Sequence, residues 1–485
     1  MLDGDERLAE LEEQRERDER RALRGFHLNR VHSTFAAWAL SFGCIVGWGA
    51  FIMPSETFLP DAGPVGTAIA LGVGAVVMIV IAVNYGYMAR QCPDAGGVYS
   101  YVRKQFGPNR AFVCSWCLVL TYLGGVVANA TALALIARSV MGDVFQVGLH
   151  YTLAGFDVYL GEILLAAVAV AIATCVCIGS ARIAGLVQVV LAVGLIGIVF
   201  CVSFVMISSS AVNAAALLPA FNPGVDAVAG TLMVAAEVPW AFVGFEAVSH
   251  SAGEGRFPAR KMTAIMIAAI VCGVMTYLLL NAWTAVMVPG GYDNWAEYIA
   301  DAPNLHGLIA FPTFHSAYQM AGDLGLALAG VAAFCAVLTG LIGFSLAASR
   351  LIFAMARDGA LPARFARLRG RSRTPVAAML AIAVLAFFAP ILGRTVIGWA
   401  IDLMSLGALI AYASTSMAVL QTARSEKRER MVACSVAGVV LSLVFAVILV
   451  VPIPGVGNTL NVESYVLLVA WVALGVNFYR PAIMR

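Results

Sequence analysis

The sequence predicts an all-α integral membrane protein with twelve transmembrane helices, on three grounds: composition, hydropathy and the placement of charge. Of the 485 residues, 61% are hydrophobic and 12% are charged, whereas soluble domains average about 45–50% and 25%. Residues 1–24 alone hold 15 of the 58 charged residues. The rest are too few to cover a soluble surface of this size. A soluble enzyme, a secreted disulfide scaffold and a nucleic-acid-binding protein are therefore disfavoured.

Apolar runs long enough to cross a bilayer, which takes about 20 residues, recur along the chain. Continuous runs indicate helices, since the strands of a membrane barrel alternate polar and apolar residues. The expected spans are residues 33–59, 64–89, 110–137, 160–178, 183–208, 227–251, 262–288, 320–349, 375–392, 395–421, 432–452 and 459–478.

Basic residues set the expected orientation. With the N-terminus in the cytoplasm, the inner tails and loops hold 28 of the 30 Lys and Arg residues, and the outer loops hold Arg138 and Arg394. Cytoplasmic loops carry such an excess, so both termini are expected in the cytoplasm and the protein in the inner (plasma) membrane. The 27 arginines against three lysines indicate a GC-rich, bacterial source.

Four regions are expected along the chain. Residues 1–32 form a charged cytoplasmic tail, helical from Leu2 to Arg24, which is either a solvated tail or a regulatory or lipid-head-group contact. Residues 33–210 and 211–424 each contain five spans, and residues 425–485 contain two more spans and a short cytoplasmic C-terminus. Because five is odd, the second set enters the membrane inverted relative to the first.

Spans 1 and 6, the first of each set, are interrupted. Gly43, Gly47 and Gly49 fall within seven residues of span 1, and glycine costs about 1 kcal/mol relative to alanine in a helix. Span 6 contains Pro239 and Gly244. Interrupted backbone at membrane depth lines a cavity or is buried in protein, and matching interruptions in two halves indicate a transporter's binding site. The alternative is two glycine-rich helices in close contact.

Four motifs occur in order on these spans. They are G-W-G-A-F at 47–51, P-D-A-G-G-V-Y at 93–99, F-V-G-F-E at 242–246 and the segment 349–362. Through them the chain resembles the amino acid–polyamine–organocation transporter superfamily, over nearly all of its length after residue 30. The resemblance implies a leucine-transporter-like fold, with a five-plus-five inverted repeat and two extra helices. It implies import or exchange of amino acids or related amines, with no cofactor and no enzymatic activity.

The resemblance also implies a substrate site between spans 1, 3, 6, 8 and 10. Backbone N–H groups of the first break would meet the substrate carboxylate, and carbonyls of the second would meet its ammonium group. The matching positions are Val46, Gly47, Trp48, Gly49, Trp240, Ala241, Phe242, Val243 and Gly244. On span 3, Tyr122 and Asn129 share a helix face, and they either reach this site or hydrogen-bond to a neighbouring helix. Trp240 further resembles the family's aromatic outer gate.

The chain departs from the family pattern at Trp48, where a small residue is usual. Either its indole narrows the site for a small substrate or one without the standard carboxylate contact, or it packs away from the site. The lysine that replaces sodium in span 5 of some relatives is absent, since all three lysines are expected in the cytoplasm. The hydroxyls of Thr339 and Ser345 are the sodium-site candidates, but Gly340 stands near where a hydroxyl is expected. Protons are therefore favoured over sodium.

Ionisable residues within spans are costly and suggest function. Glu246, His250 and Asp402 are the candidates for proton coupling or gating. Their alternative roles are, respectively, a structural hydrogen-bond acceptor, a residue at the cytoplasmic mouth, and a cap for a helix irregularity. No metal site is expected, since Cys114 and Cys117 form a C-x-x-C pair without a second pair.

The sequence thus predicts a secondary transporter of an amino acid or small amine-bearing derivative, working by alternating access with proton symport or exchange. Its partners are a small-molecule substrate and the lipid bilayer, without nucleic acid. The alternatives are a transporter-derived nutrient sensor that signals through the N-terminal tail, and a channel.

Overall fold

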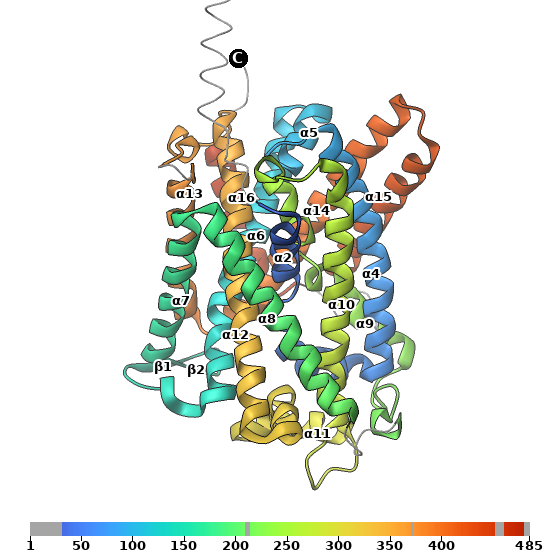
Figure 1. Cartoon of the computed structure of the whole chain (residues 1–485), viewed down its shortest axis with the longest axis vertical. Coiled ribbons are helices and arrows are strands. Elements are labelled where there is room, and N and C mark those ends of the chain that lie inside the picture. Colours follow the sequence, from blue (N-terminus) through green and yellow to red (C-terminus); the bar gives the residue numbers. More distant parts are fainter. Residues whose placement is uncertain (1–31, 209–213, 370–372, 452–459, 480–485) are drawn as a thin grey trace, which may run out of the picture.

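The computed structural model describes residues 32–208, 214–369, 373–451 and 460–479. Nearly all of this part of the chain is helical, and long helices run side by side as a bundle (Figure 1). A hairpin of two antiparallel strands, β1 (His150–Leu153) and β2 (Phe156–Tyr159), lies at one end of the bundle. The helix predicted between Leu2 and Arg24 lies outside the described residues.

Helical elements follow the predicted spans closely. The first half contains α2 (Thr34–Ile45), α3 (Gly49–Met53), the π-helical turn η1 (Pro54–Phe58), α4 (Leu59–Gln91), α5 (Val98–Phe106), α6 (Pro108–Met141), α7 (Leu160–Gly179) and α8 (Ala181–Ser208). The second half and the C-terminal region contain α9 (Ala227–Ala241), the 3-10 helix η4 (Phe245–Glu254), α10 (Met262–Val286), α11 (Trp295–Asp301), α12 (Pro312–Arg357), α13 (Val376–Phe388), η9 (Ala389–Leu392), α14 (Thr395–Ser425), α15 (Glu429–Val450) and α16 (Val462–Phe478).

Nine helical stretches of the described chain are long and apolar enough to cross a membrane. Three shorter apolar helices lie at residues 34–45, 376–392 and 462–478, within predicted spans 1, 9 and 12. All twelve predicted ranges therefore contain apolar helix, and the protein is a multi-pass membrane protein. The count of twelve crossings and the inverted repeat stay predictions.

Two long helices bend where a predicted span begins. In α4, Gly63 has a φ of 71° and precedes Pro64, and in α12, Gly322 has a φ of 59°. Glycine adopts positive φ at low cost because it has no Cβ. The spans predicted to start at residues 64 and 320 therefore start at these bends, and helix continues on the other side of each bend.

Close helix contacts hold the centre of the bundle together. An ideal Cβ on Gly407 of α14 would lie 2.4 Å from the carbonyl oxygen of Cys117 on α6, so glycine lets these two backbones approach. Small residues serve this purpose in membrane helices generally. At the C-terminal edge, Trp116 of α6 stacks on Trp471 of α16 with ring centroids 4.4 Å apart. Helix α6 thus contacts both α14 and the last helix.

The two ends of the bundle carry different elements (Figure 1). We call the end with β1 and β2 the hairpin end and the opposite end, with α5, the α5 end. Arg138 and Arg394, assigned above to outer loops, line one cavity at the hairpin end. Helix α5 carries Arg103 and Lys104 in its last turn.

Buried ion pairs join three elements toward the α5 end. Arg350 of α12 makes a two-pronged contact with Glu254 at the end of η4, with N–O distances of 2.8 and 3.3 Å. The two side chains are 1% and 2% exposed. His32, just before α2, donates its backbone N–H to the Glu254 carbonyl (3.0 Å) and places Nε2 3.5 Å from the Glu254 carboxylate. The start of α2 is therefore held against the end of η4.

Asp94, in the loop between α4 and α5, forms a more accessible pair. Its carboxylate accepts two hydrogen bonds from Arg357 (3.0 and 2.9 Å) and one from Ser100 (2.6 Å). Burial acts to raise the pKa of Asp94, but the hydrogen bonds and charge of Arg357 outweigh burial and lower the pKa to about 2. Because 3.8 is its ordinary value, ionised Asp94 stabilises the fold above about pH 4, and this stabilisation is lost as the pH falls toward 2.

We expect Asp94→Asn to remove part of the acid-induced loss of stability. The variant should be less stable than the wild type near neutral pH, and the difference should shrink as the pH falls from about 4 to 2, because both carboxyl and amide are then uncharged. Thermal unfolding of the detergent-purified protein across this range measures the difference. A difference that stays constant with pH would contradict the assignment.

Candidate functional site

The chain is broken between α2 and α3. Helix α2 ends at Ile45, and residues 46–48 connect it to α3, which begins at Gly49. The hydroxyl of Tyr277 on α10 donates to the carbonyl of Ile45 (3.3 Å). The N–H groups of Ala50 and Phe51 at the start of α3 donate to the carbonyls of Gly47 and Trp48 (3.2 and 3.1 Å). The start of a helix carries the positive end of the helix dipole, which suits an anionic group.

A second break lies between α9 and η4. Gly244 occupies it with a φ of 107°, which disfavours any residue with a side chain. An ideal Cβ on Gly244 would also lie 2.2 Å from the Cβ of Cys44 on α2. Next to it, the carbonyl of Phe245 accepts a hydrogen bond from the hydroxyl of Ser41 on α2 (3.0 Å). The two breaks are therefore in direct contact.

A cavity of about 20 Å³ lies between the two breaks. This volume suits roughly one water molecule, so the site is too small for an amino acid in this state. The predicted residues that line it are Gly47, Trp48, Gly49, Asn129, Trp240 and Val243. The predicted residues that do not line it are Val46, Ala241, Phe242, Gly244 and Tyr122. Residues that the sequence reasoning missed complete its lining: Cys44, Ile45, Ala128, Tyr277, Phe344 and Met404.

Two tryptophans line the cavity between the breaks. The rings of Trp48 and Trp240 have centroids 6.0 Å apart and planes inclined by 56°. The Trp48 backbone N–H donates to Oδ1 of Asn129 on α6 (3.4 Å). An ideal Cβ on Gly49 would lie 2.4 Å from the Trp240 ring. The indole of Trp48 thus occupies the central site rather than the lipid-facing surface.

We expect Trp48→Ser to enlarge the site and widen its substrate range. Removing the indole should raise uptake of L-phenylalanine relative to L-alanine by roughly tenfold or more, since each pocket methylene can change selectivity by this order. Uptake by proteoliposomes measures the ratio. The control is Trp471→Ser, the same substitution at the contact between α6 and α16, which should leave the uptake ratio unchanged. An unchanged ratio in Trp48→Ser would count against a role for the Trp48 side chain in selectivity.

A fully buried carboxyl group lies beside the cavity. Oε1 of Glu246 accepts a hydrogen bond from the hydroxyl of Tyr122 on α6 (3.2 Å), and Oε2 accepts from the hydroxyl of Tyr412 on α14 (3.2 Å). The Gly244 N–H also donates to Oε2 (3.0 Å). Within the described part of the chain, no Lys or Arg forms an ion pair with this side chain. Glu246 therefore holds the break between α9 and η4 against α6 and α14.

His250 and Glu246 contact the same tyrosine. The His250 ring meets the Tyr122 ring edge-on, with centroids 5.4 Å apart. An ideal Cβ on Gly97, in the loop before α5, would lie 2.8 Å from Nδ1 of His250. This buried imidazole therefore lies between Glu246 and the α5 end.

Asp402 lies elsewhere. Its Oδ2 accepts hydrogen bonds from the backbone N–H and side-chain amide of Asn461 (3.0 and 2.9 Å) and from the hydroxyl of Ser464 (2.6 Å). These contacts join α14 to the start of α16. The structure does not bring Asp402 together with Glu246.

The sodium-site candidates on α12 show packing contacts. The hydroxyl of Thr339 lies 2.9 Å from the carbonyl oxygens of Cys335 and Ala336 in its own helix. An ideal Cβ on Gly340 would lie 2.6 Å from Oδ1 of Asn129. Glycine here makes room for the asparagine that lines the cavity.

Tyr412 and Tyr277 contact the site but belong to none of the four motifs. Each is the sole tyrosine of its helix, α14 or α10. A buried tyrosine hydroxyl usually finds a hydrogen-bond partner, so a lone tyrosine in an apolar span is a weak signal for such a contact. The sequence does not say which partner the hydroxyl reaches, because that depends on how the helices are rotated.

A multi-pass membrane protein with a small cavity between two broken helices has the architecture of a transporter. Comparison of sequences identifies the family. The pattern of the amino acid permease family matches residues 33–474, and the chain belongs to this family.

Characterised relatives cover most of the chain. A branched-chain amino acid permease of Lactococcus lactis, BcaP, is 24% identical over 83% of this chain and 84% of its own. The methylthioribose transporter of Bacillus subtilis is 26% identical over 81% of each chain. The human cationic amino acid transporter 4 is 26% identical over 82% of this chain and 61% of its own length. The relatives thus differ in the substrate they are named for.

Proposed function

We propose that the protein is a secondary active transporter that moves an amino acid or small amine-bearing derivative across the membrane by alternating access. The observation that carries this proposal is the small cavity between two facing helix breaks. One break offers N–H groups to a carboxylate, and the other offers carbonyl groups to an ammonium group. A cavity for roughly one water must open to admit such a substrate, which fits a protein that alternates between states.

The lining supports a neutral, apolar substrate side chain. Ile45, Val243, Phe344 and Met404 contribute apolar surface to the cavity, and among the residues that the structure describes no acidic residue lines it. A cationic side chain placed here would be desolvated, which is costly, and the carboxyl group of Glu246 beside the cavity is already held by three neutral donors. The relationship to a branched-chain amino acid permease agrees with this choice.

Proton coupling through Glu246, or exchange without coupling, completes the proposal. Glu246 has three neutral donors from three elements, so a change of its protonation alters contacts of both α6 and α14. The charge bias of the loops supports an α5 end in the cytoplasm and a hairpin end outside.

Uptake by proteoliposomes, without sodium, tests this function. The panel is L-alanine, L-valine, L-leucine, L-lysine, L-arginine and methylthioribose. In a second measurement, a ligand at about 100 times its dissociation constant should stabilise the purified protein against unfolding by roughly 2.7 kcal/mol. We expect saturable uptake of a neutral amino acid. Uptake of lysine alone or methylthioribose alone would contradict the substrate class, and non-saturating flux would favour a channel.

A further inference from the structure

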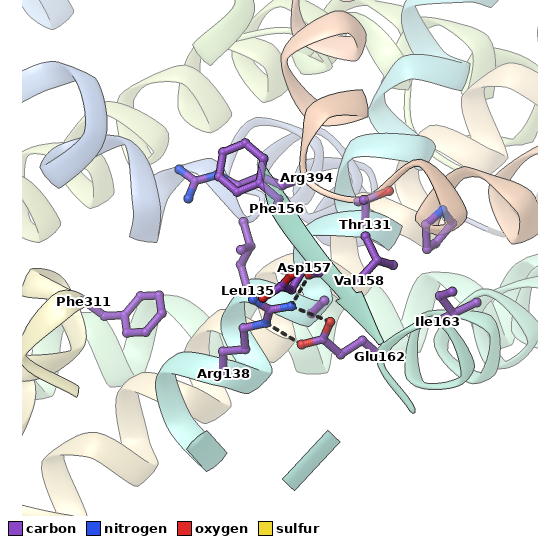
Figure 2. Close-up of a pocket in the computed structure, with 13 residues that line it drawn as sticks. Thr131, Leu135, Arg138, Phe156, Asp157, Val158, Glu162, Ile163, Phe311 and Arg394 are labelled. Atoms are coloured by element: carbon purple, nitrogen blue, oxygen red, sulfur yellow. Dashed lines mark hydrogen bonds and ion pairs between the residues drawn. The ribbon is translucent and has the colours of Figure 1, made fainter. Parts of the chain in front are cut away.

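A second cavity, of about 130 Å³, lies at the hairpin end (Figure 2). Residues of α6, β2, α7, the segment before α12 and the segment between η9 and α14 line it. A cavity of about 150 Å³ holds benzene, so this one suits a ligand of about six non-hydrogen atoms, which is the size of alanine. It is therefore large enough for a small amino acid while the central cavity is not.

One face of α6 leads from the central cavity to this one. Ala128 lines the central cavity, and Thr131, Leu135 and Arg138 line the second. Their spacing of three, four and three residues places them on the same helix face, and ten residues of helix span about 15 Å. Met404 of α14 lines the central cavity, and Arg394, directly before the first residue of α14, lines the second, again ten residues apart. The second cavity thus lies on the side of the central site toward the hairpin end.

The two arginines of this cavity differ in their bonding. Arg138 makes a two-pronged contact with Glu162 and donates to the carbonyl of Asp157 (2.7 Å), so its charge is neutralised in place. Arg394 is held by Glu56 of η1 through one nitrogen, Nη2. Within the described part of the chain its other guanidinium nitrogens have no hydrogen-bond partner. The Arg394–Glu56 pair is also accessible, since the side chains are 35% and 42% exposed.

Other groups around Arg394 make the cavity a formed site. The guanidinium carbon lies 5.1 Å from the centre of the Phe156 ring, which fixes its orientation, as Figure 2 shows. Thr131 is 4% exposed, and its hydroxyl has no partner among the described residues. Asp157 also lines the cavity, and a hydrogen bond from Thr152 lowers its pKa. The cavity therefore offers a cation, an anion and a free hydroxyl.

We propose that this cavity is a second binding site for the transported amino acid, in which the substrate carboxylate replaces Glu56 on Arg394. This proposal rests on the proposed function. The substrate ammonium group lies toward Asp157, and the side chain packs against Phe156. Because Glu56 belongs to η1, loss of its arginine partner releases the hairpin-end half of the first broken helix. Occupation of the second site thereby opens the way to the central one.

Equilibrium binding tests the second site. The probe is radiolabelled L-alanine, whose size matches the cavity, and L-valine and L-leucine are measured beside it. We expect two sites in the wild type and one in Arg394→Gln. We also expect one site in Gly47→Leu, which fills the central cavity and leaves the second. In Glu56→Gln the second site should bind the probe roughly two- to fivefold more tightly, because an exposed ion pair of ordinary strength no longer competes.

Arg110→Gln is the matched control. Arg110 also lies over a phenylalanine ring, at 5.5 Å from Phe106, but at the other end of α6, and its replacement should leave both sites intact. If the wild type has one site and Glu56→Gln binds the probe with unchanged affinity, the proposal of a second site is overturned, whereas the proposed transport function is not. Absence of binding and uptake for all three amino acids would overturn both. Tighter binding in Glu56→Gln cannot arise from misfolding, so a damaged variant does not imitate the expected result.

Discussion

Replacing Arg350 with Met is expected to lower the free energy of unfolding by about 3–5 kcal/mol, the usual cost of removing one partner from a buried ion pair. Both side chains are almost completely buried, and Arg350 contacts both carboxylate oxygens of Glu254. The variant leaves the Glu254 charge with His32 as its remaining neighbour. A marked fall in the thermal-unfolding midpoint of the detergent-purified protein is the measurement.

Two further variants make this expectation specific. Arg103→Met breaks the pair with Asp358 at the α5 end, where Arg103 is 43% exposed, and should cost about 0–1 kcal/mol. The double variant Arg350→Met with Glu254→Leu removes both buried charges and should be more stable than Arg350→Met alone. Equal effects of Arg350→Met and Arg103→Met would contradict the importance of burial here.

Glu246→Gln is expected to flatten the pH dependence of uptake. A single titrating group changes the fraction in its active form by up to about tenfold per pH unit, and a glutamine does not titrate. The glutamine still accepts hydrogen bonds through its carbonyl oxygen, so the break between α9 and η4 should remain formed. Uptake at a series of pH values, at equal protein content in the liposomes, measures the change.

Matched variants separate proton carriage from structure. Tyr412→Phe removes one hydrogen bond to Glu246 and keeps the carboxyl, so it should shift the pH profile without abolishing it. Asp402→Asn changes a carboxylate that bonds to α16 and should leave the profile in place. A full pH response in Glu246→Gln would exclude Glu246 from coupling, and loss of the response in Asp402→Asn would move that role to α14.

The breaks were predictable because their causes are local. Gly47, Gly49, Pro239 and Gly244 weaken a helix wherever it lies, and the structure has breaks at both places. Hydropathy likewise located apolar helix in all twelve ranges. It missed the helical residues just before Gly63 and Gly322, because these short stretches contain polar residues such as Asp61, His315 and Gln319 and are separated by a kink from the long apolar helices.

The partners of the buried carboxyl group were not predictable in the same way. Whether Tyr412 reaches Glu246 depends on the rotation of α14 against η4, and that rotation is set by packing over the whole helix. The same limit applies to Asp402, whose partner Ser464 is 62 residues away in sequence. Spacing along one helix gives a shared face, as for Tyr122 and Asn129, but of these two only Asn129 lines the cavity.

The contacts between α2 and η4 make one rigid unit of two segments, each of which is half of a broken helix. They are joined near the breaks by Ser41 with Phe245 and by Cys44 with Gly244, and at their far ends by His32 with Glu254. Because α2 and η4 are in contact at both ends, neither segment can rotate without moving the other. A ligand that contacts only one of these two segments therefore moves both. A substitution in either segment likewise changes the rigidity of both.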